Sequence, residues 1–355
     1  QEHEKSPAFN QVNRNKLGMA VDLTHAQGRE LALKLVAEAD AVIENQATGV
    51  MDKLGLSYEQ LATVNSSIIM LSLPAFGAVG PWSGYRGYGS TVEHGAGLPH
   101  LTGDPDGPPT QTHVAYGDAC GGINAASALL VALFHRKRTG VGQRVELSQT
   151  ECITQLGIHG TIHQGLRGEA PLRTGRRHPS YVPHGCFACK ETDTWLVIAV
   201  TEDAQWPKLC EVAGLAHLSA DSTLTSAAGR RNREAELEQL ISNWARQMSA
   251  DQAMEQLQAA GVGAAAVRKA TQLLGDSALN ERGYWEDMPR AVVGTKPQPM
   301  GAYRINGRRP QLNHAAPLLG EHNRQVLRTV LRLSDGAIDE LERAGVIGDT
   351  PIVAA

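Results

Sequence analysis

The sequence predicts an α/β fold whose first half contains a parallel sheet. Strand-like and helix-like runs alternate over residues 18–73, and strands joined through helices pair in parallel. Glycine is abundant, with 37 residues, and aromatic side chains make up only 5% of the chain, which suits closely packed helices and strands.

The predicted elements of this first half follow one another closely. Residues 18–23 are apolar and predicted to be extended, and residues 24–39 have helical apolar spacing with Thr24 as the cap. Buried strands are predicted at 41–44 and 67–73, with a short helix at 58–64 between them. A loop rich in glycine and proline follows at 74–109, and long loops in α/β proteins often line a site.

The second half is predicted to contain a smaller α+β part. A helix is expected to begin at Asp118 and to run through the apolar residues 123–134. Extended structure resumes at 144–151 and leads into a helix ending near 158, and the turn-rich residues 166–185 are a candidate crossover. The remaining predictions are strands at 195–200 and 263–267, helices at 204–214, a helical pair at 234–260 capped at Ser242 and Ser249, and helices at 320–331 and 334–345.

Composition excludes several classes of function. The chain has 355 residues and a net charge of −4, and its one basic group is at 136–138, so no nucleic-acid partner is expected. No uninterrupted apolar run reaches the roughly 18 residues that span a bilayer, and the first fifteen residues are polar. We therefore expect a cytoplasmic protein with no membrane partner.

The five cysteines indicate a reducing compartment, because an odd, sparse set in a long chain does not form a disulfide framework. Cys186 and Cys189 form the one close pair, with His178 and His184 nearby. A single pair lacks the second pair of a typical zinc site, and residues 186–189 also have the pattern of a strand. No metal is expected.

Asp118 is the most informative residue for predicting the function. It stands at the mouth of the predicted helix in the string YGDACGG, residues 116–122. A carboxylate there can cap the helix by accepting a backbone N–H, or it can act as a nucleophile on an activated acyl carbon. This segment by itself leaves both interpretations open and favours the cap.

Several unusual strings occur in a fixed order along the whole chain. They are NRNK at 13–16, VDL at 21–23, ADAVIEN at 39–45, GVMDKLGL at 49–56, FG at 76–77, GP at 80–81, TG at 102–103, DGPP at 106–109, GD at 117–118, RTGVGQ at 138–143 and APLLGEH at 316–322. Together they resemble the class III CoA-transferase family, which includes formyl-CoA:oxalate and carnitine CoA-transferases and shares its fold with the α-methylacyl-CoA racemases.

The resemblance implies a Rossmann-like large domain built from both ends of the chain, with an inserted small α+β domain. The corresponding boundaries are 1–170 for the first part of the large CoA-binding domain, 171–190 for a crossover linker, 191–290 for the small domain and 291–355 for the return linker and C-terminal helices. Two such chains would interlock as a dimer.

The resemblance also implies a function for Asp118, which matches the family's catalytic aspartate. The enzyme would move CoA from an acyl-CoA donor to a small carboxylic acid through a mixed anhydride and an aspartyl-CoA thioester. The small neighbours Gly117, Ala119, Gly121 and Gly122 would leave room for the anhydride and offer backbone N–H groups to a developing oxyanion.

Residues that would line CoA follow by position from the same resemblance. They are Leu23, Asn45, Gln46, Val50, Lys53, Arg86 and Tyr88. Without the resemblance, Lys53 and Arg86 would be interpreted as ordinary surface charges. Asn45 would be interpreted as a turn residue and Tyr88 as a loop tyrosine. Gln46 stands where the family commonly has an aromatic side chain, so stacking on adenine is not expected there.

Tyr88 departs from the racemases, which carry an acid/base histidine at this position. A phenol with a pKa near 10 is a poor substitute at neutral pH, so acyl transfer is favoured over the alternative, racemisation or epimerisation of an α-methylacyl-CoA. His94 and His113 are near in sequence, and both are interpreted as loop or helix residues.

The stretch 179–185 also departs from the family. It corresponds to a glycine-rich loop of formyl-CoA transferase but has a single glycine and is bulkier. An acceptor larger than oxalate is therefore expected, with Tyr181, His184 and Gly185 as candidate substrate contacts.

A third departure concerns the N-terminal side of the sequence. Members of the family have a first strand and helix before the position of Asn13, and this sequence begins after them. A homodimer is one expectation. The others are a heteromeric or fused partner that supplies this unit, and a non-catalytic CoA-binding subunit.

Overall fold

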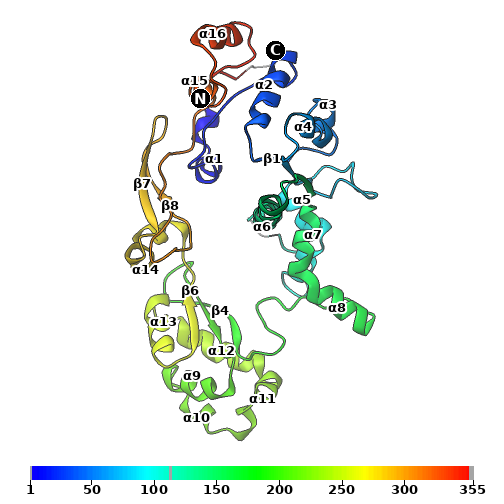
Figure 1. Ribbon diagram of the computed structural model, residues 1–355. Coiled ribbons are helices and arrows are strands. Elements are labelled where there is room, and N and C mark those ends of the chain that lie inside the picture. Colours follow the sequence, from blue (N-terminus) through cyan, green and yellow to red (C-terminus); the bar gives the residue numbers. More distant parts are fainter. Residues whose placement is uncertain (1, 112–113, 352–355) are drawn as a thin grey trace. The chain divides into compact units, whose positions relative to one another are not determined.

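The computed structural model of the protein describes residues 2–111 and 114–351, and these form two compact units (Figure 1). Unit 1 comprises residues 1–96, 114–155 and 273–355, and unit 2 comprises residues 97–113 and 156–272. Unit 1 therefore draws on both ends of the chain, and unit 2 on two internal segments.

Unit 1 is built around a three-stranded parallel sheet. The strands β1 (Ala41–Glu44), β2 (Ile69–Ser72) and β3 (Gln143–Glu146) lie in the order β1-β2-β3. Ala41 pairs with Ile69, and Ile69 pairs with Gln143, so all three carboxyl ends meet at one edge. All four residues of β2 are buried, as expected for a central strand covered on both faces.

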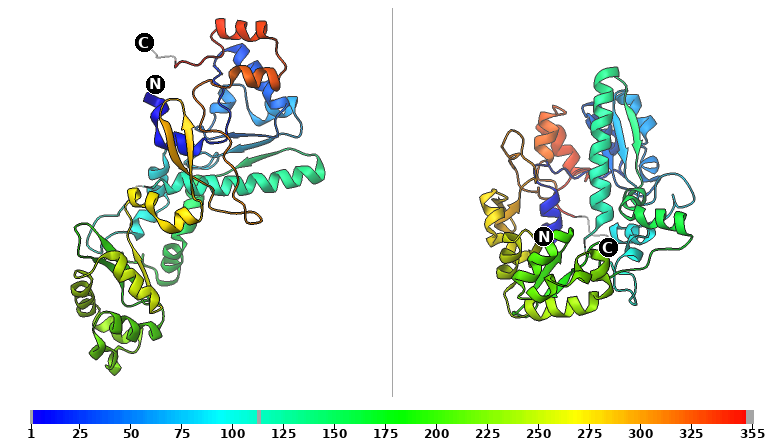
Figure 2. Two further views of the ribbon diagram at one scale, coloured as in Figure 1. Left: turned by 90° about the vertical axis from the view of Figure 1, so that its left-hand side faces the viewer. Right: turned by 90° about the horizontal axis from the view of Figure 1, so that it is seen from below.

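Helices cover both faces of this sheet. On one face α2 (Ala26–Ala37) and α4 (Tyr58–Val64) pack against Ile68 and Met70 through a cluster that includes Val36 and Leu61. On the other face α6 (Tyr116–Thr139) packs through Ala125 against Leu71 and Leu73. Successive residues of β2 point to opposite faces, which explains why one strand serves both clusters. Figure 2 shows α6 lying along the sheet.

The rest of unit 1 consists of short elements. The internal segments contribute α3 (Val50–Lys53), α5 (Gly89–Gly95) and α7 (Gln149–Thr154). The two ends contribute η1 (Glu2–Lys5), α1 (Pro7–Val12), α14 (Ser277–Glu281), the hairpin β7 (Trp285–Arg290) and β8 (Gly294–Pro299), α15 (Asn323–Thr329) and α16 (Asp335–Arg343). A cluster of Leu31, Leu327, Ile338, Val346 and Ile347 joins α2 to the C-terminal helices.

Unit 2 holds an antiparallel sheet with helices against it. Its strands β4 (His184–Ala188), β5 (Trp195–Ala199) and β6 (Gly263–Ala266) lie in the order β4-β5-β6. Its helices are η2 (Leu98–Leu101), α8 (Ile158–Arg167), η4 (Asp203–Gln205), α9 (Trp206–Val212), α10 (Ala216–Ser219), η5 (Ser222–Leu224), α11 (Ala227–Asn232), α12 (Glu234–Ala245) and α13 (Ala250–Ala259). Two short 3-10 helices, η3 (Gln155–Gly157) and η6 (Ala270–Gly275), lie where the chain passes between the units.

Many of the predicted elements are confirmed, but the strand at 18–23 is wrong. Only one isolated bridge, between Val21 and Ile347, occurs there. Thr24 is not the cap of α2 either: its hydroxyl donates to Asp22, and His25 accepts the N–H of Gln27 through Nδ1.

Other differences concern segments whose helices or strands have little sequence signal. The predicted loop 74–109 contains α5 and η2, the start of the crossover at 166–185 continues α8, and the hairpin β7–β8 was not expected. The cap at Ser249 is confirmed, whereas Ser242 lies inside α12.

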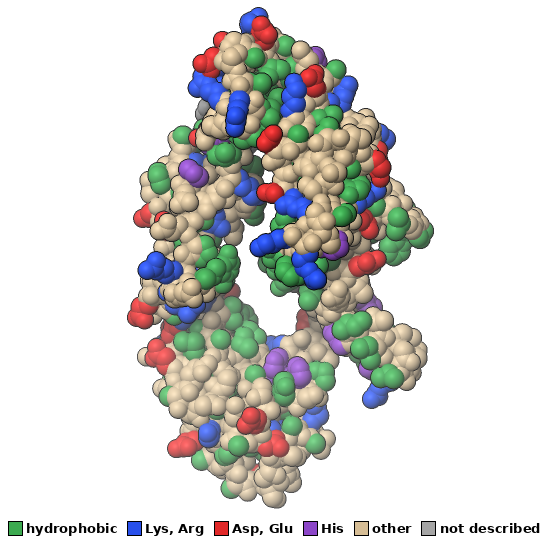
Figure 3. Space-filling model, in the orientation of Figure 1, with side chains coloured by type: hydrophobic (Ala, Val, Ile, Leu, Met, Phe, Trp, Pro, Cys, Tyr) green, Lys and Arg blue, Asp and Glu red, His purple; other side chains and the backbone are tan. Residues whose placement is uncertain are grey.

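α6 combines a packed face with an exposed apolar one. Among the described residues, it is the one helix that is long and apolar enough to cross a membrane. The core helices of soluble proteins also meet this criterion of length and composition. Ala125 faces the sheet, whereas Ile123, Leu130, Val131 and Phe134 are exposed. Figure 3 shows hydrophobic side chains gathered in the region of α6.

Candidate active site

Asp118 lies in the first turn of α6, two residues after the helix begins at Tyr116. The N-cap is Ala115, which has no side-chain capping bond, so the cap interpretation of Asp118 is wrong. The Asp118 side chain is exposed, and it makes no hydrogen bond to any residue that the structure describes. Its carboxylate is therefore both accessible and placed in the positive field of the helix N-terminus.

Glu93 on α5 supplies a capping contact that the sequence did not reveal. Its Oε1 accepts the backbone N–H of Tyr116, the first residue of α6, at 2.8 Å. Glu93 is only 1% exposed, and a carboxylate so deeply buried normally requires such hydrogen bonds. Because a side chain from another helix satisfies this terminal N–H, no capping role is left for Asp118 at that position.

α5 and α6 approach each other through two glycines beside Asp118. A Cβ added to Gly89 would lie 2.5 Å from Asp118 Oδ2 and 2.8 Å from Ala115 Cβ. A Cβ added to Gly117 would lie 2.8 Å from the carbonyl oxygen of Gly89. The carboxylate therefore lies directly against the start of α5, where only glycine fits.

The carboxyl edge of the sheet is connected to the first turns of α6. Gln149, buried at the start of α7, donates from Nε2 to Asn45 Oδ1 at 3.2 Å and to the carbonyl of Leu73 at 3.1 Å. The same side chain fills the space beside Gly121, one turn after Asp118. In parallel α/β sheets this edge is where ligands usually bind.

All seven residues predicted to line CoA lie in unit 1, the unit that contains Asp118. Asn45 and Gln46 follow β1 directly and are exposed, and Val50 and Lys53 begin and end α3. Leu23 is partly buried, and like Met51 and Leu54 it packs against the cluster that includes Val36 and Leu61.

Arg86 and Tyr88 lie in the segment that leads into α5. Tyr88 is the N-cap residue of α5 and is 85% exposed. It directly precedes Gly89, whose backbone lies against the Asp118 carboxylate. His94, on the last turn of α5, is close to the carbonyl of Ser90, with Nδ1 at 2.8 Å, and His113 lies outside the described residues.

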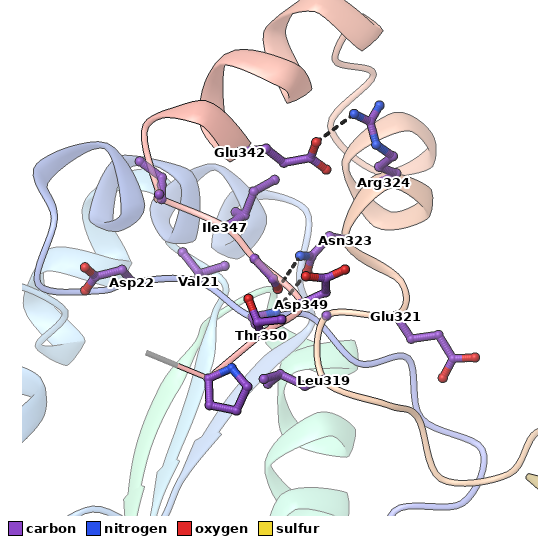
Figure 4. Close-up of a pocket in the computed structure, with 16 residues that line it drawn as sticks. Val21, Asp22, Leu319, Glu321, Asn323, Arg324, Glu342, Ile347, Asp349 and Thr350 are labelled. Atoms are coloured by element: carbon purple, nitrogen blue, oxygen red, sulfur yellow. Dashed lines mark hydrogen bonds and ion pairs between the residues drawn. The ribbon is translucent and has the colours of Figure 1, made fainter. Parts of the chain in front are cut away.

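A cavity of about 900 Å³ lies elsewhere in unit 1, between residues 20–22 and the segments 319–324 and 345–351 (Figure 4). Four carboxylates line it, from Asp22, Glu321, Glu342 and Asp349, against the single guanidinium of Arg324. Arg324 is already paired with Glu342 at 2.8 Å. This acidic lining would repel phosphate groups, and none of the predicted site residues contributes to it.

Comparison with known proteins decides the family. The family model described as CoA-transferase family III matches residues 1–323. The chain belongs to CoA-transferase family III. Accordingly this protein is an enzyme that transfers CoA between acids.

Two relatives and one solved structure illustrate the match. The chain is 29% identical to succinyl-CoA–D-citramalate CoA-transferase of Chloroflexus aurantiacus, over 94% of this chain and 83% of the relative. It is 30% identical to succinyl-CoA:glutarate CoA-transferase of Mus musculus, over 97% and 78%. A crystal structure of a CaiB/BaiF family protein from Brucella suis superposes with a TM-score of 0.82 at 30% identity, covering 91% of this chain and 83% of that one. The α/β fold is thus the fold of this family.

The three predicted substrate contacts of this CoA-transferase lie in unit 2, at the start of β4. Tyr181 stacks on His178, with ring centroids 4.2 Å apart and planes 12° apart. His178 Nδ1 accepts the backbone N–H groups of Ser180 and Tyr181, which leaves the neutral ring with its proton on Nε2. Burial first, and then the charges of His184 and Arg231, lower the pKa of His178.

Two arginines of α11 hold this segment in place. The side chain of Arg230 is 1% exposed and donates from Nε to the carbonyl of Val182 at 2.6 Å. Arg231 donates to the carbonyls of His178 and Pro179 and pairs with Glu234. The segment 178–185 is therefore a turn that hydrogen bonds hold in place. Its own sequence does not predict these bonds, because both arginines lie about fifty residues later.

Cys186 and Cys189, the one close cysteine pair, are half-buried and buried respectively. Cys186 and Cys189 lie on or next to β4, and burial raises the pKa of both thiols. Within residues 2–111 and 114–351, no group of three His, Cys, Asp or Glu side chains is placed to hold a metal ion.

Replacing Gly89 tests how closely the site depends on this contact. We expect Gly89→Ala to lower kcat about 100-fold, because the new methyl group must displace the Asp118 carboxylate and crowd Ala115. Gly336→Ala on α16 is the matched control, since a Cβ there meets nothing within 4 Å. Steady-state kinetics with thermal melts would check this, and unchanged kcat in a folded Gly89→Ala enzyme would contradict the geometry.

Proposed function

We propose that this enzyme moves CoA from an acyl-CoA donor to a carboxylic acid acceptor through covalent intermediates on Asp118. The observation that carries the proposal is the state of this carboxylate, which is exposed, lies in the first turn of a helix, and is hydrogen-bonded to none of the described residues. A carboxylate must be ionised and free of strong partners to attack a thioester.

The proposed reaction needs neither water nor an oxidant or reductant. An Asp118 oxygen attacks the thioester carbonyl of the donor, the C–S bond breaks, and the thiolate leaves with the electron pair, giving a mixed anhydride. The thiolate then attacks the Asp118 carbonyl carbon and expels the donor acid as a carboxylate, giving an aspartyl-CoA thioester. The acceptor carboxylate repeats both steps in reverse order and leaves as the new thioester.

The helix contributes to this chemistry without deciding it. The N-terminal field of a helix such as α6 favours a negative charge in its first turn by about 0.3–1 kcal/mol. The backbone N–H groups of Gly117 and Asp118 would be candidates to stabilise the tetrahedral oxyanion, a larger effect in enzymes of this kind. The N–H of Ala119, also expected from the sequence to contribute, instead donates to the carbonyl of Ala115 at 3.1 Å.

We assign CoA binding to unit 1, and we propose that this unit is the Rossmann-like domain expected from the sequence, without residues 97–113 and 156–170. Support comes from the position of Asn45, Gln46, Val50 and Lys53 after β1 at the carboxyl edge of the sheet, and of Arg86 and Tyr88 next to α5. Lys53 and Arg86 would meet the phosphates, and Leu23 would contribute apolar contact. Tyr181, His184 and Gly185 remain candidate contacts of the acid.

Two chains are proposed to form an interlocked dimer in the cytoplasm. The exposed apolar side chains of α6, including Leu130, Val131 and Phe134, are what supports an interface there. Analytical ultracentrifugation of the wild type and of a Val131→Lys, Phe134→Lys double variant would test it, since a monomeric wild type would contradict the dimer.

The function is tested by mixing acyl-CoA donors with carboxylate acceptors and following both thioesters by mass spectrometry. We expect stoichiometric exchange with no net hydrolysis, because water is not a reactant. Deuterium uptake at the α-carbon of a 2-methylacyl-CoA without any acceptor would instead favour the racemase. Binding of CoA without exchange for any pair would favour a non-catalytic partner subunit.

A further inference from the structure

Phe76, Trp82 and Tyr85 form an aromatic cluster in the segment between β2 and α5. Trp82 and Tyr85 are stacked at 17° with centroids 6.4 Å apart, and each meets Phe76 edge to face at 6.0 and 6.1 Å. The whole chain has four Phe, five Trp and seven Tyr. Four of these sixteen residues, counting Tyr88, fall within residues 76–88, so the segment is strongly enriched.

The cluster is exposed, although aromatic groups of this size are normally buried. Trp82 is 46% exposed and Tyr85 is 61% exposed. Phe76 is partly buried and fixes the base of the cluster, because its ring edge lies 2.9 Å from where a Cβ of Gly87 would be and 3.2 Å from that of Gly95. An exposed aromatic surface whose rings pack against one another indicates a binding site rather than core packing.

The cluster is also close to the nucleophile. Phe76 lies against Gly87, and the Asp118 carboxylate lies against Gly89. Two residues of chain span at most about 7 Å, so the base of the cluster and the carboxylate flank the same short stretch at the start of α5.

We propose that this cluster is the subsite for the acyl group and that it takes a flat, apolar acyl chain such as an aryl group. This inference rests on the function proposed for Asp118. The acyl group begins at the carbon that Asp118 attacks, so it must occupy space next to the carboxylate. Adenine is the other flat group of the substrate, but the long pantetheine arm separates it from the thioester.

The experiment compares two donors, benzoyl-CoA and succinyl-CoA, through formation of the CoA adduct on Asp118 and through kcat/KM of transfer. Trp82→Ala and Tyr85→Ala should lower kcat/KM for benzoyl-CoA about 10- to 100-fold and change that for succinyl-CoA by about twofold at most. Trp82→Phe should retain most of the benzoyl-CoA activity. Tyr303→Ala, which removes another exposed aromatic side chain of unit 1, is the control and should affect neither donor.

The outcomes separate this inference from the function on which it rests. No adduct with either donor in the wild type would overturn the proposed function itself. Adduct formation with succinyl-CoA alone, or an equal loss with both donors in Trp82→Ala, would overturn the aromatic subsite and leave the function of Asp118 standing.

Discussion

Asp118→Ala is expected to abolish CoA transfer, lowering kcat by at least about 1000-fold, while CoA still binds. Removing a nucleophile on which covalent intermediates form costs a factor of this order or more in other enzymes. Binding should persist because the residues assigned to CoA lie before α2, after β1 or at the start of α5, and none of them is hydrogen-bonded to the Asp118 side chain. Isothermal titration with CoA and the donor–acceptor assay measure the two effects separately.

The control for this substitution is Asp287→Asn, which removes an exposed charge from β7 in the same unit. It should leave kcat unchanged. Asp118→Asn is a second test, because an amide keeps the size of the side chain but is a poor nucleophile. Retained turnover in either Asp118 variant would rule out the covalent route.

Arg290→Met is expected to produce the largest loss of stability, about 3–5 kcal/mol in the free energy of unfolding. Arg290 and Glu4 form an ion pair whose side chains are 5% and 7% exposed, and Arg290 also donates to the carbonyls of Ala316 and Pro317. The second Glu4 oxygen accepts the N–H of Leu319. Removing the guanidinium takes one partner away from a buried ion pair, which is the costly change for such pairs.

Arg324→Met is the matched control. Arg324 pairs with Asp339 and Glu342, but its side chain is 39% exposed, so water replaces the lost contacts. Its loss should cost less than about 1 kcal/mol. Urea titrations of both variants give the comparison, and equal stabilities would show that the Glu4–Arg290 pair does not hold the N-terminal segment.

The parts of the fold with strong apolar patterns were predictable from the sequence. β2 begins with three apolar residues, Ile69 to Leu71, and α13 has both helical spacing and a serine cap at Ser249. Residues 18–23 have the same apolar character, yet they form only one bridge because strand formation needs a neighbouring chain as well as a pattern. The hairpin β7–β8 has charged and proline residues along it, so its pattern gave no signal.

The candidate site was partly predictable for a similar reason. The position of Asp118 followed from ordered motifs along the chain, and the structure places it in the first turn of α6. The contacts around this carboxylate were not predictable, because Glu93 and Gly89 come from another helix and no local motif marks them. The arginines that hold residues 178–182 are distant in sequence in the same way.

The central claim is that CoA becomes attached to Asp118 during transfer. The most direct measurement incubates the enzyme with donor thioester in the absence of acceptor, digests it, and analyses the peptide containing Asp118 by mass spectrometry. The account predicts that this peptide gains CoA with loss of one water, that hydroxylamine converts the adduct to a hydroxamate, and that Asp118→Asn shows neither product. Transfer that proceeds at full rate with no adduct at Asp118, or an adduct on another residue, would contradict it.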